Sequence, residues 1–358
     1  MSPQLSRTGE WFLNSGIQFA DGGVARYCLT DSRRNLPAST EITGYAASTL
    51  AYLHSVTHDA RYLDRARAAA HFLVRAWDPA SRTMPFEVDP PQHTYFFDCG
   101  IIVRGLLAVW RATAEKELLD TAIATADSML RDFASPDGDF HPILELPSKT
   151  ATPRDPLRWS RSATCYQLKS AMAWCDLYEI TGHERFLEAY ERVLAAGLRS
   201  WADFLPGHPE LAKVMDRLHA FSYFLEGLLP RASRPECAAA LRDGIRSAAH
   251  YLRDIAPEFA RSDVYAQILR VRLFADWLGA VPLDLAAAEH EATQLASFQQ
   301  PESNPSDPLV DGGYWFGRKG AQLLPFINPV SAAFACQALQ LWVSSRPGAA
   351  HADRHLLI

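Results

Sequence analysis

Several features that identify common protein classes are missing from this sequence of 358 residues. Its six cysteines are scattered, with no C-x-x-C pair and no histidine at metal-ligand spacing nearby. No G-x-S-x-G, H-E-x-x-H, P-loop or Rossmann signature occurs, which argues against serine-hydrolase, metal and nucleotide chemistry. We therefore expect no metal and no cofactor, and we interpret the cysteines as reduced and mostly buried small apolar residues.

Long apolar runs and blocks of like charge are also missing. The sequence has no uninterrupted stretch of about 18 apolar residues, and its start, MSPQLSRTGEWFLNSG, lacks a basic segment followed by an apolar one. The net charge is -6, and no cluster of Lys and Arg stands out, so nucleic acid is not an expected partner. Other polyanions are poor candidates unless they are bound locally. We expect a soluble cytoplasmic protein without membrane insertion, and the oligomeric state stays open.

Helical periodicity dominates what is present. Hydrophobic residues make up 48% of the chain and charged residues 21%, which is the balance of a globular protein with a sizeable core. Apolar positions recur at i, i+3, i+4 and i+7, whereas strand-like alternation is scarce. The sequence predicts about twelve helices, at 3–19, 41–56, 60–77, 97–113, 117–133, 162–180, 184–203, 214–229, 235–255, 262–279, 284–299 and 327–345.

The connections predict how these helices are arranged. Links after even-numbered helices are tight turns, which indicates antiparallel hairpins, and most links after odd-numbered helices are long. A degenerate repeat marks three of the short turns, as VTHDARYLDRA (56–66), ATAEKELLDTA (112–122) and ITGHERFLEAY (180–190). Units of nearly 60 residues or more are too long and variable for a regular solenoid. We predict an all-α fold, a closed (α/α)6 toroid of six hairpins that forms a single domain over residues 1–358.

In such a ring the even-numbered helices line the centre, and their amino-terminal ends meet at the long-loop face. Free N–H groups and partial positive charge at these ends favour carboxylates and oxygen-rich ligands. Polar residues near the six predicted starts are Glu41, Asp98, Arg161, Tyr166, His219, Asp263 and Asn328. Several of these residue types are also ordinary helix caps, and for Asp263 that alternative carries equal weight.

Spacing and flanking residues favour some of these positions for chemistry. Asp98 lies between two phenylalanines and the run CGII, surroundings that raise a carboxyl pKa and suit a general acid. His219, Tyr223 and Glu226 share one helical face, and Asp263, Gln267 and Arg270 repeat the spacing on the next inner helix. Buried hydrogen-bond networks or ion pairs would use the same spacing. The predicted catalytic residues are Asp98, Glu226, Asp263 and His219, and the predicted substrate-binding residues are Glu41, Tyr45, Arg161, Tyr166, Tyr223, Gln267, Arg270, Trp315, Arg318 and Asn328.

Aromatic residues near the long loops could stack on the apolar faces of sugar rings, although most aromatic residues simply belong to a core. The segment DGGYWFGRKG (311–320) stands out because four glycines surround Tyr-Trp-Phe and Arg318. This composition predicts a flexible, exposed loop that could close over a ligand through Trp315 and Arg318.

The chain also resembles the six-hairpin glycosidase-like superfamily, including bacterial members associated with polysaccharide metabolism. The matching pieces are TEITGYAASTLAYL, FDCGIIVRGLLAVW, CYQLKSAMAWCDLYEITGHERFLEAY, LHAFSYFLEGLL and SDVYAQILRVRLF, and the segments GGYWFGRKG and PFINPVSAAFACQAL look like the closing part of the same architecture. The resemblance implies the toroid and a sugar or oligosaccharide substrate, but not one reaction. Catalytic signatures of the sugar 2-epimerases are missing. It implies these cleft positions: Glu41, Asp98, His219, Glu226, Asp263 and Gln267.

Three functions remain open on the sequence. A glycoside hydrolase would use Asp98 as general acid and Glu226 or Asp263 as the paired carboxylate. An epimerase or lyase would abstract a proton, with His219, Tyr223 and Arg270 as base, acid and charge stabiliser. A glycan-binding protein would keep the toroid without the chemistry.

Overall fold

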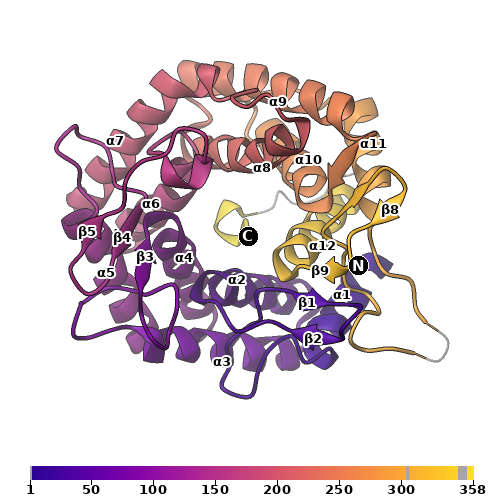
Figure 1. The fold of residues 1–358 in the computed structure, drawn as a ribbon, viewed down its shortest axis with the longest axis horizontal. Helices are drawn as coiled ribbons and strands as arrows, with labels where there is room; N and C mark the ends of the chain where they lie inside the picture. The colour runs from indigo at the N-terminus through magenta and orange to yellow at the C-terminus, as the bar shows by residue number, and fades with distance from the viewer. Residues whose placement is uncertain (1, 304–305, 346–352) are drawn as a thin grey trace.

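The computed structural model describes residues 2–303, 306–345 and 353–358. Within these ranges the chain forms twelve α-helices arranged as two concentric rings (Figure 1). The helices are α1 (Pro3–Asn14), α2 (Thr40–Thr57), α3 (Ala60–Ala76), α4 (Phe96–Thr113), α5 (Lys116–Asp132), α6 (Gln167–Thr181), α7 (Glu184–Ser200), α8 (Leu211–Leu228), α9 (Pro235–Ile255), α10 (Ser262–Trp277), α11 (Leu285–Ala296) and α12 (Pro329–Ser344). The predicted all-α toroid is confirmed. None of the described helices is both long and apolar enough to cross a membrane.

Contacts between consecutive even-numbered helices close the inner ring. Each of α2, α4, α6, α8 and α10 packs on the next, and α12 returns to pack on α2. The outer partners are α3, α5, α7, α9 and α11, and α1 packs on α12 to complete the sixth hairpin. First and last helices are thus direct neighbours, as a closed ring requires.

The sequence repeat at the short turns corresponds to a shared hydrogen-bond pattern. The hydroxyls of Thr57, Thr113 and Thr181 each donate to the carbonyl four residues earlier, at 2.7, 3.0 and 2.8 Å. Each hydroxyl also accepts the backbone N–H two residues later, at 3.2–3.3 Å. The residue between adopts a left-handed conformation, which ends one helix and lets its partner begin. One threonine therefore satisfies backbone groups of both helices in each of these hairpins.

The two rings differ in burial, as the sequence pattern indicates. Helices α3, α5, α7 and α9 bury one face each, whereas nearly every residue of α4, α10 and α12 is buried. Neighbouring inner helices approach closely where glycines meet. A Cβ added to Gly105 in α4 would lie 2.4 Å from the carbonyl oxygen of Gly44 in α2, so only glycine fits there.

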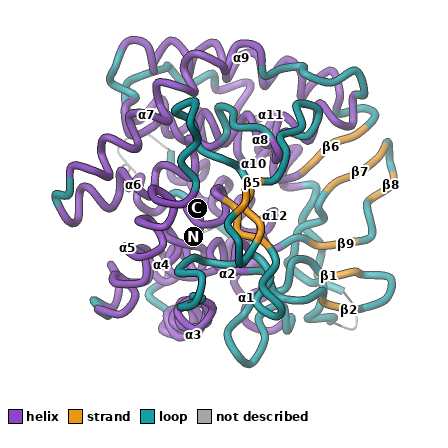
Figure 2. Tube along the Cα trace, turned by 60° about the vertical axis from the view of Figure 1, so that its left-hand side comes forward, coloured by secondary structure: helices purple, strands orange, loops and turns teal. Residues whose placement is uncertain are grey.

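Short strands connect the long loops at one end of the ring. Three antiparallel sheets have the strand orders β2-β1-β9, β3-β4-β5 and β6-β7-β8. The strands are β1 (Cys28–Leu29), β2 (Arg34–Asn35), β3 (His93–Tyr95), β4 (Ile143–Glu145), β5 (Thr150–Ala151), β6 (Phe259–Arg261), β7 (Gly317–Lys319), β8 (Gln322–Leu323) and β9 (Phe326–Ile327). In Figure 2, β1, β2 and β6 to β9 lie together on one side of the helices. The sheets join loops from different hairpins and so fix the rim around the inner helix starts.

The last described segment, residues 353–358, lies in the middle of the ring (Figure 1). The Gln337 amide donates to the carbonyl of Leu356, and its side-chain oxygen accepts from the N–H of Ile358. The Ile358 carbonyl accepts from Lys169 in α6 and from Arg270 in α10, at 3.0 and 2.9 Å. This segment therefore contacts three inner helices from within the ring.

Candidate active site

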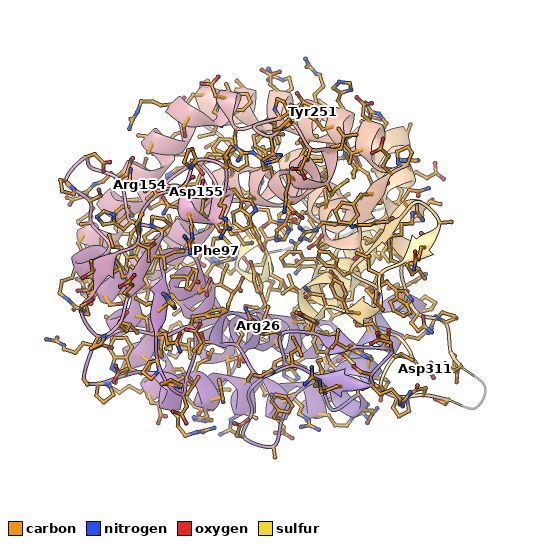
Figure 3. All side chains as sticks on the ribbon, in the orientation of Figure 1. Arg26, Phe97, Arg154, Asp155, Tyr251 and Asp311 are labelled. Atoms are coloured by element: carbon orange, nitrogen blue, oxygen red, sulfur yellow. The ribbon has the colours of Figure 1, made fainter. Side chains whose placement is uncertain are left out.

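A cavity of about 260 Å³, lined by both charged and aromatic residues, lies at the long-loop end of the inner ring. It is formed by the starts of α2 and α4, the third and fourth turns of α8, and the loops before α2, α4 and α6. Figure 3 labels Arg26 and Phe97, which lie at the inner edge of the ring. The residues that line the cavity are Arg26, Glu41, Phe86, Tyr95, Phe97, Asp98, Pro142, Trp159, Ser160, Tyr166, His219 and Tyr223.

Two carboxyl groups face this cavity, and both belong to the first turn of an inner helix. Asp98 in α4 is 7% exposed, and its Oδ2 has no hydrogen-bond partner among the described residues. Burial, followed by the nearby Glu41 carboxyl, raises the pKa of Asp98 well above its ordinary value. Burial also raises the pKa of Glu41 to about 7, although the charge of Arg26 opposes this. Burial thus outweighs the helix dipole, which favours ionised acids at these positions, and at Asp98 the nearby Glu41 carboxyl adds to the effect of burial.

Arg26 supplies positive charge to the cavity and was not among the predicted site residues. It comes from the loop between α1 and α2, and its guanidinium lies 4.8 Å from the centre of the Phe86 ring. The ring holds the cation at the cavity wall. Its sequence context, GGVARYC, shows no helix start or spacing that could have identified it.

His219 lines the cavity from α8, and a hydrogen bond to Gln267 holds its ring in place. Its Nδ1 lies 2.7 Å from Oε1 of Gln267 and 3.4 Å from Oδ2 of Asp263. Because Oε1 can only accept, Nδ1 carries the proton, which leaves the Nε2 lone pair without a partner among the described residues. Burial lowers the pKa of His219 to about 4, although Asp263 acts in the opposite direction. The imidazole is therefore neutral near pH 7.

Asp263 is engaged away from the cavity. Arg261 donates to its two oxygens from Nε and Nη2, at 3.0 and 2.6 Å. Burial acts to raise the pKa of Asp263, but this guanidinium outweighs it, and the pKa is lowered. Asp263 thus reaches the cavity only through His219.

Glu226 lies deeper in the ring and does not line the cavity. It is fully buried, 2.8 Å from Nζ of Lys169 and 2.5 Å from Nη2 of Arg270. Above it, the Tyr45 hydroxyl donates to the Tyr223 hydroxyl at 3.0 Å. These two tyrosines separate the cavity from the ion-pair cluster of Lys169, Glu226 and Arg270.

Solved structures of low sequence identity share this architecture. Cellobiose 2-epimerase from Spirochaeta thermophila DSM 6192 aligns with a TM-score of 0.72 at 14% identity, over 94% of both chains. A D-mannose isomerase aligns with a TM-score of 0.65 at 8% identity, over 95% of this chain and 97% of the isomerase chain. The GH76A alpha-1,6-mannanase from Salegentibacter sp. HEL1_6 aligns with a TM-score of 0.57 at 10% identity, over 96% of this chain and 100% of the mannanase chain. The chain has the (α/α)6 toroid fold. It matches no family model and no curated protein.

The toroid brings together many of the predicted site residues. Glu41, Asp98, Tyr166, His219 and Tyr223 line the cavity. His219 does so from the third turn of α8, because this helix begins at Leu211 and not at 214 as predicted. Tyr45, Gln267 and Asp263 contact lining residues but do not line the cavity themselves.

Other predicted binding residues lie elsewhere in the toroid. Arg270 is used in the buried cluster with Glu226. Arg161 ends a short 3-10 helix (Trp159–Arg161) and does not line the cavity, whereas its neighbours Trp159 and Ser160 do. Asn328 caps α12, since its Oδ1 accepts the N–H of Val330 at 2.8 Å. The capping alternative thus accounts for the placement of Asn328.

The 311–320 segment differs from the flexible loop that its glycines predicted. Gly317–Lys319 is strand β7, paired with β6 and β8. Nε1 of Trp315 donates to Gln300 at 2.7 Å, and Nη2 of Arg318 donates to Gln294 at 2.9 Å. Neither residue lines the cavity, because strand pairing and these bonds hold the segment against α10 and α11.

All six cysteines are free and buried, as expected. Among the described residues, Asp176, Glu179 and His355 form one group with metal-ligand spacing, outside the cavity lining. Arg354 contacts both of these carboxylates and Arg104 contacts Asp176, so the group is already neutralised by cations.

Proposed function

We propose that the protein is a glycoside hydrolase acting on a sugar or oligosaccharide in this cavity, with Asp98 as general acid and Glu41 as the paired carboxylate. One observation supports the proposal most directly. The two carboxyl groups share a cavity in which the pKa of Asp98 lies well above its ordinary value and that of Glu41 is about 7. Near neutral pH one group is therefore protonated while the other ionises, which is the division that glycoside hydrolysis needs.

Each group has a defined task in this scheme. Asp98 donates its proton to the glycosidic oxygen as the bond to the anomeric carbon breaks. Ionised Glu41 either activates a water molecule or attacks the anomeric carbon, according to the stereochemical course. Tyr95, Phe97 and Trp159 provide flat apolar surfaces for the sugar ring.

The partner assigned to Asp98 changes from the sequence-based hypothesis. Glu226 is enclosed by Lys169 and Arg270, and Asp263 is held by Arg261. Glu41 has no ion-pair partner among the described residues and lines the same cavity as Asp98. It is therefore the better candidate for a reacting carboxylate.

Substitution of the two acids tests the proposal on a panel of aryl glycosides and oligosaccharides. Asp98→Asn should lower turnover by about two orders of magnitude or more, with sugar binding and helical content retained. Glu41→Gln should also lower turnover, and Asp64→Asn, an exposed change on α3, is the matched control. Full activity of Asp98→Asn would exclude its role as acid. Saturable binding without turnover in the wild type would instead identify a glycan-binding protein.

His219 supports a second candidate, a sugar epimerase or isomerase. Its ring is neutral, its Nδ1–H is committed to Gln267, and its Nε2 is free to accept a proton from a sugar carbon. The 2-epimerase and the mannose isomerase also have the higher TM-scores of the three structures compared. Reaction in deuterated water separates the candidates, because carbon deuteration of recovered sugar requires proton abstraction. His219→Asn should abolish that exchange, while His290→Asn on the exposed side of α11 should not.

We further propose that the chain forms one domain and works in the cytoplasm. Closure of the ring by α1, α2 and α12 supports a single domain. The six unpaired cysteines are compatible with a reducing compartment.

A further inference from the structure

A second hollow, of about 530 Å³, adjoins the candidate active site. The two share Trp159 and Ser160 as a common wall. Its remaining lining comes from the loop before α6, the loop before α8 and the first turns of α8, including Asp155, which is labelled in Figure 3. A ligand longer than one sugar unit could therefore extend from the cavity into this hollow.

Arg217 is built firmly into the wall of the hollow. It is 7% exposed, and its Nε and Nη2 donate to the carbonyl oxygen of Phe204 at 3.0 and 2.7 Å. The guanidinium also lies 4.2 Å from the centre of the Phe204 ring. Gly207 has a φ of +58°, and a Cβ there would lie 2.3 Å from Nε, so glycine makes room for the cation.

Its charge has no counterpart, which sets Arg217 apart from the other buried arginines. Arg104, Arg261, Arg270 and Arg272 each form an ion pair with a buried carboxylate. Arg217 forms none with the described residues, and its buried Nη1 has no hydrogen-bond partner there. Burying an unpaired cation costs free energy, so a site that keeps one is suited to an anionic ligand.

The acids around the hollow do not supply the missing charge. Asp155 lies 3.6 Å from Arg158, and Asp216 lies 2.9 Å from Arg261. Lys213, an exposed lining residue, adds a second cation without an ion pair among the described residues. The hollow thus has a local excess of positive charge on a chain whose net charge is -6.

We infer that this hollow is a subsite for an anionic sugar residue, whose carboxylate or sulfate group is bound by Arg217 with support from Lys213. The substrate class is then an acidic oligosaccharide that places one residue at Asp98 and Glu41 and a charged neighbour beyond Trp159. Nε and one N–H of Nη2 are used by the Phe204 carbonyl, so Nη1 and the second N–H of Nη2 are the groups of Arg217 left for the anion's oxygens. The inference deepens the proposed function and rests on it for the substrate's second residue.

Binding of three small probes to the full chain tests the inference: D-glucuronate, D-glucose 6-sulfate and D-glucose at equal ionic strength. At least one anionic probe should bind about tenfold or more tightly than glucose, as a hydrogen bond to a charged group predicts. The anionic probe that binds more tightly identifies the recognised group as carboxylate or sulfate. Arg217→Met should remove the preference for the anionic probe and leave the dissociation constant for glucose unchanged. The control Arg242→Met, on the exposed side of α9, should keep the preference.

The inference is overturned if all three probes bind equally, or if folded Arg217→Met keeps the preference. Sulfate ion alone binding as tightly as glucose 6-sulfate would also overturn it, since the sugar would then contribute nothing. Should Arg217→Met not fold, Lys213→Gln replaces it as the test, with an expected loss of about twofold to fivefold for anionic probes only. An unchanged preference in that variant counts against the subsite.

Failure of the subsite and failure of the hydrolase proposal give different results. Arg217-dependent binding in Asp98→Asn without turnover in the wild type would retain the subsite and remove the hydrolase. Hydrolysis of neutral oligosaccharides with no dependence on Arg217 would retain the hydrolase and remove the subsite.

Discussion

At the scale of single residues, the first turns of α2 and α4 place two acids where opposing effects act on them. The helix dipole favours the ionised forms of Glu41 and Asp98, and such an interaction typically stabilises each charge by roughly 0.3–1 kcal/mol. Burial acts against ionisation and prevails for both groups, and the nearby Glu41 carboxyl adds to the effect on Asp98. The apolar flanks of Asp98 correctly predicted the direction of its pKa shift. They could not reveal that its neighbour is Glu41, because 57 positions along the chain separate the two.

These shifts predict a bell-shaped dependence of turnover on pH. The working form has Glu41 ionised and Asp98 protonated, so turnover should rise as pH passes about 7 and fall at higher pH as Asp98 ionises. The positive charge of Arg26 lowers the pKa of Glu41. Arg26→Met should therefore move the rising limb of kcat to higher pH. A limb that stays in place would show that Glu41 does not control it, and Arg242→Met serves as the control.

At the scale of helices, the cluster of Lys169, Glu226 and Arg270 joins α6, α8 and α10 beneath the cavity. All three side chains are fully buried, and burial lowers the pKa of Lys169 to about 7. Lys169 and Arg270 also donate to the Ile358 carbonyl, so the cluster fixes residues 353–358 in the ring. Its position indicates a role in holding the inner helices together.

Glu226→Gln tests that role. Removing one member of a buried ion pair leaves an uncompensated charge, so the free energy of unfolding should fall by roughly 3–5 kcal/mol. Urea denaturation monitored by circular dichroism measures this, with Glu289→Gln on the exposed side of α11 as control. Turnover per folded molecule should change far less than in Asp98→Asn. Unchanged stability with lost turnover would return Glu226 to the catalytic residues.

At the scale of the whole molecule, each hairpin packs on two neighbours, and the sheets tie separate loops together. The β2-β1-β9 sheet connects the loop before α2 to the loop before α12, which reinforces closure where the ends of the chain meet. No described hairpin can separate without exposing two inner-helix faces.

Unfolding should therefore be one cooperative event, with a far-UV circular dichroism spectrum dominated by helix. Thermal transitions followed by ellipticity and by tryptophan fluorescence should coincide. Limited proteolysis gives an independent check, because cleavage in a long loop should not release two stably folded halves. Two separate transitions, or a folded half, would contradict the single-domain proposal.

The sequence was most informative where its signal is local. Periodicity located all twelve helices, and the repeated threonine turns identified three of the helix pairs. Errors arose where burial by distant segments decides the outcome. The glycines at 311–320 predicted a flexible loop, whereas residues 317–319 of that segment form a strand paired with β6 and β8. Arg26 had no local signal at all, since only the ring places its loop beside Glu41 and Asp98.

By itself the sequence determined the all-α class, the hairpins and the end of the ring at which polar residues gather. Tertiary structure alone decided which of them share a cavity. His219 and Glu226 lie on one face of α8, but seven residues at 1.5 Å each separate them by about 10 Å along the axis. The first therefore reaches the cavity, while the second reaches the buried cations of α6 and α10. Helical spacing defines a shared face, and only packing defines depth.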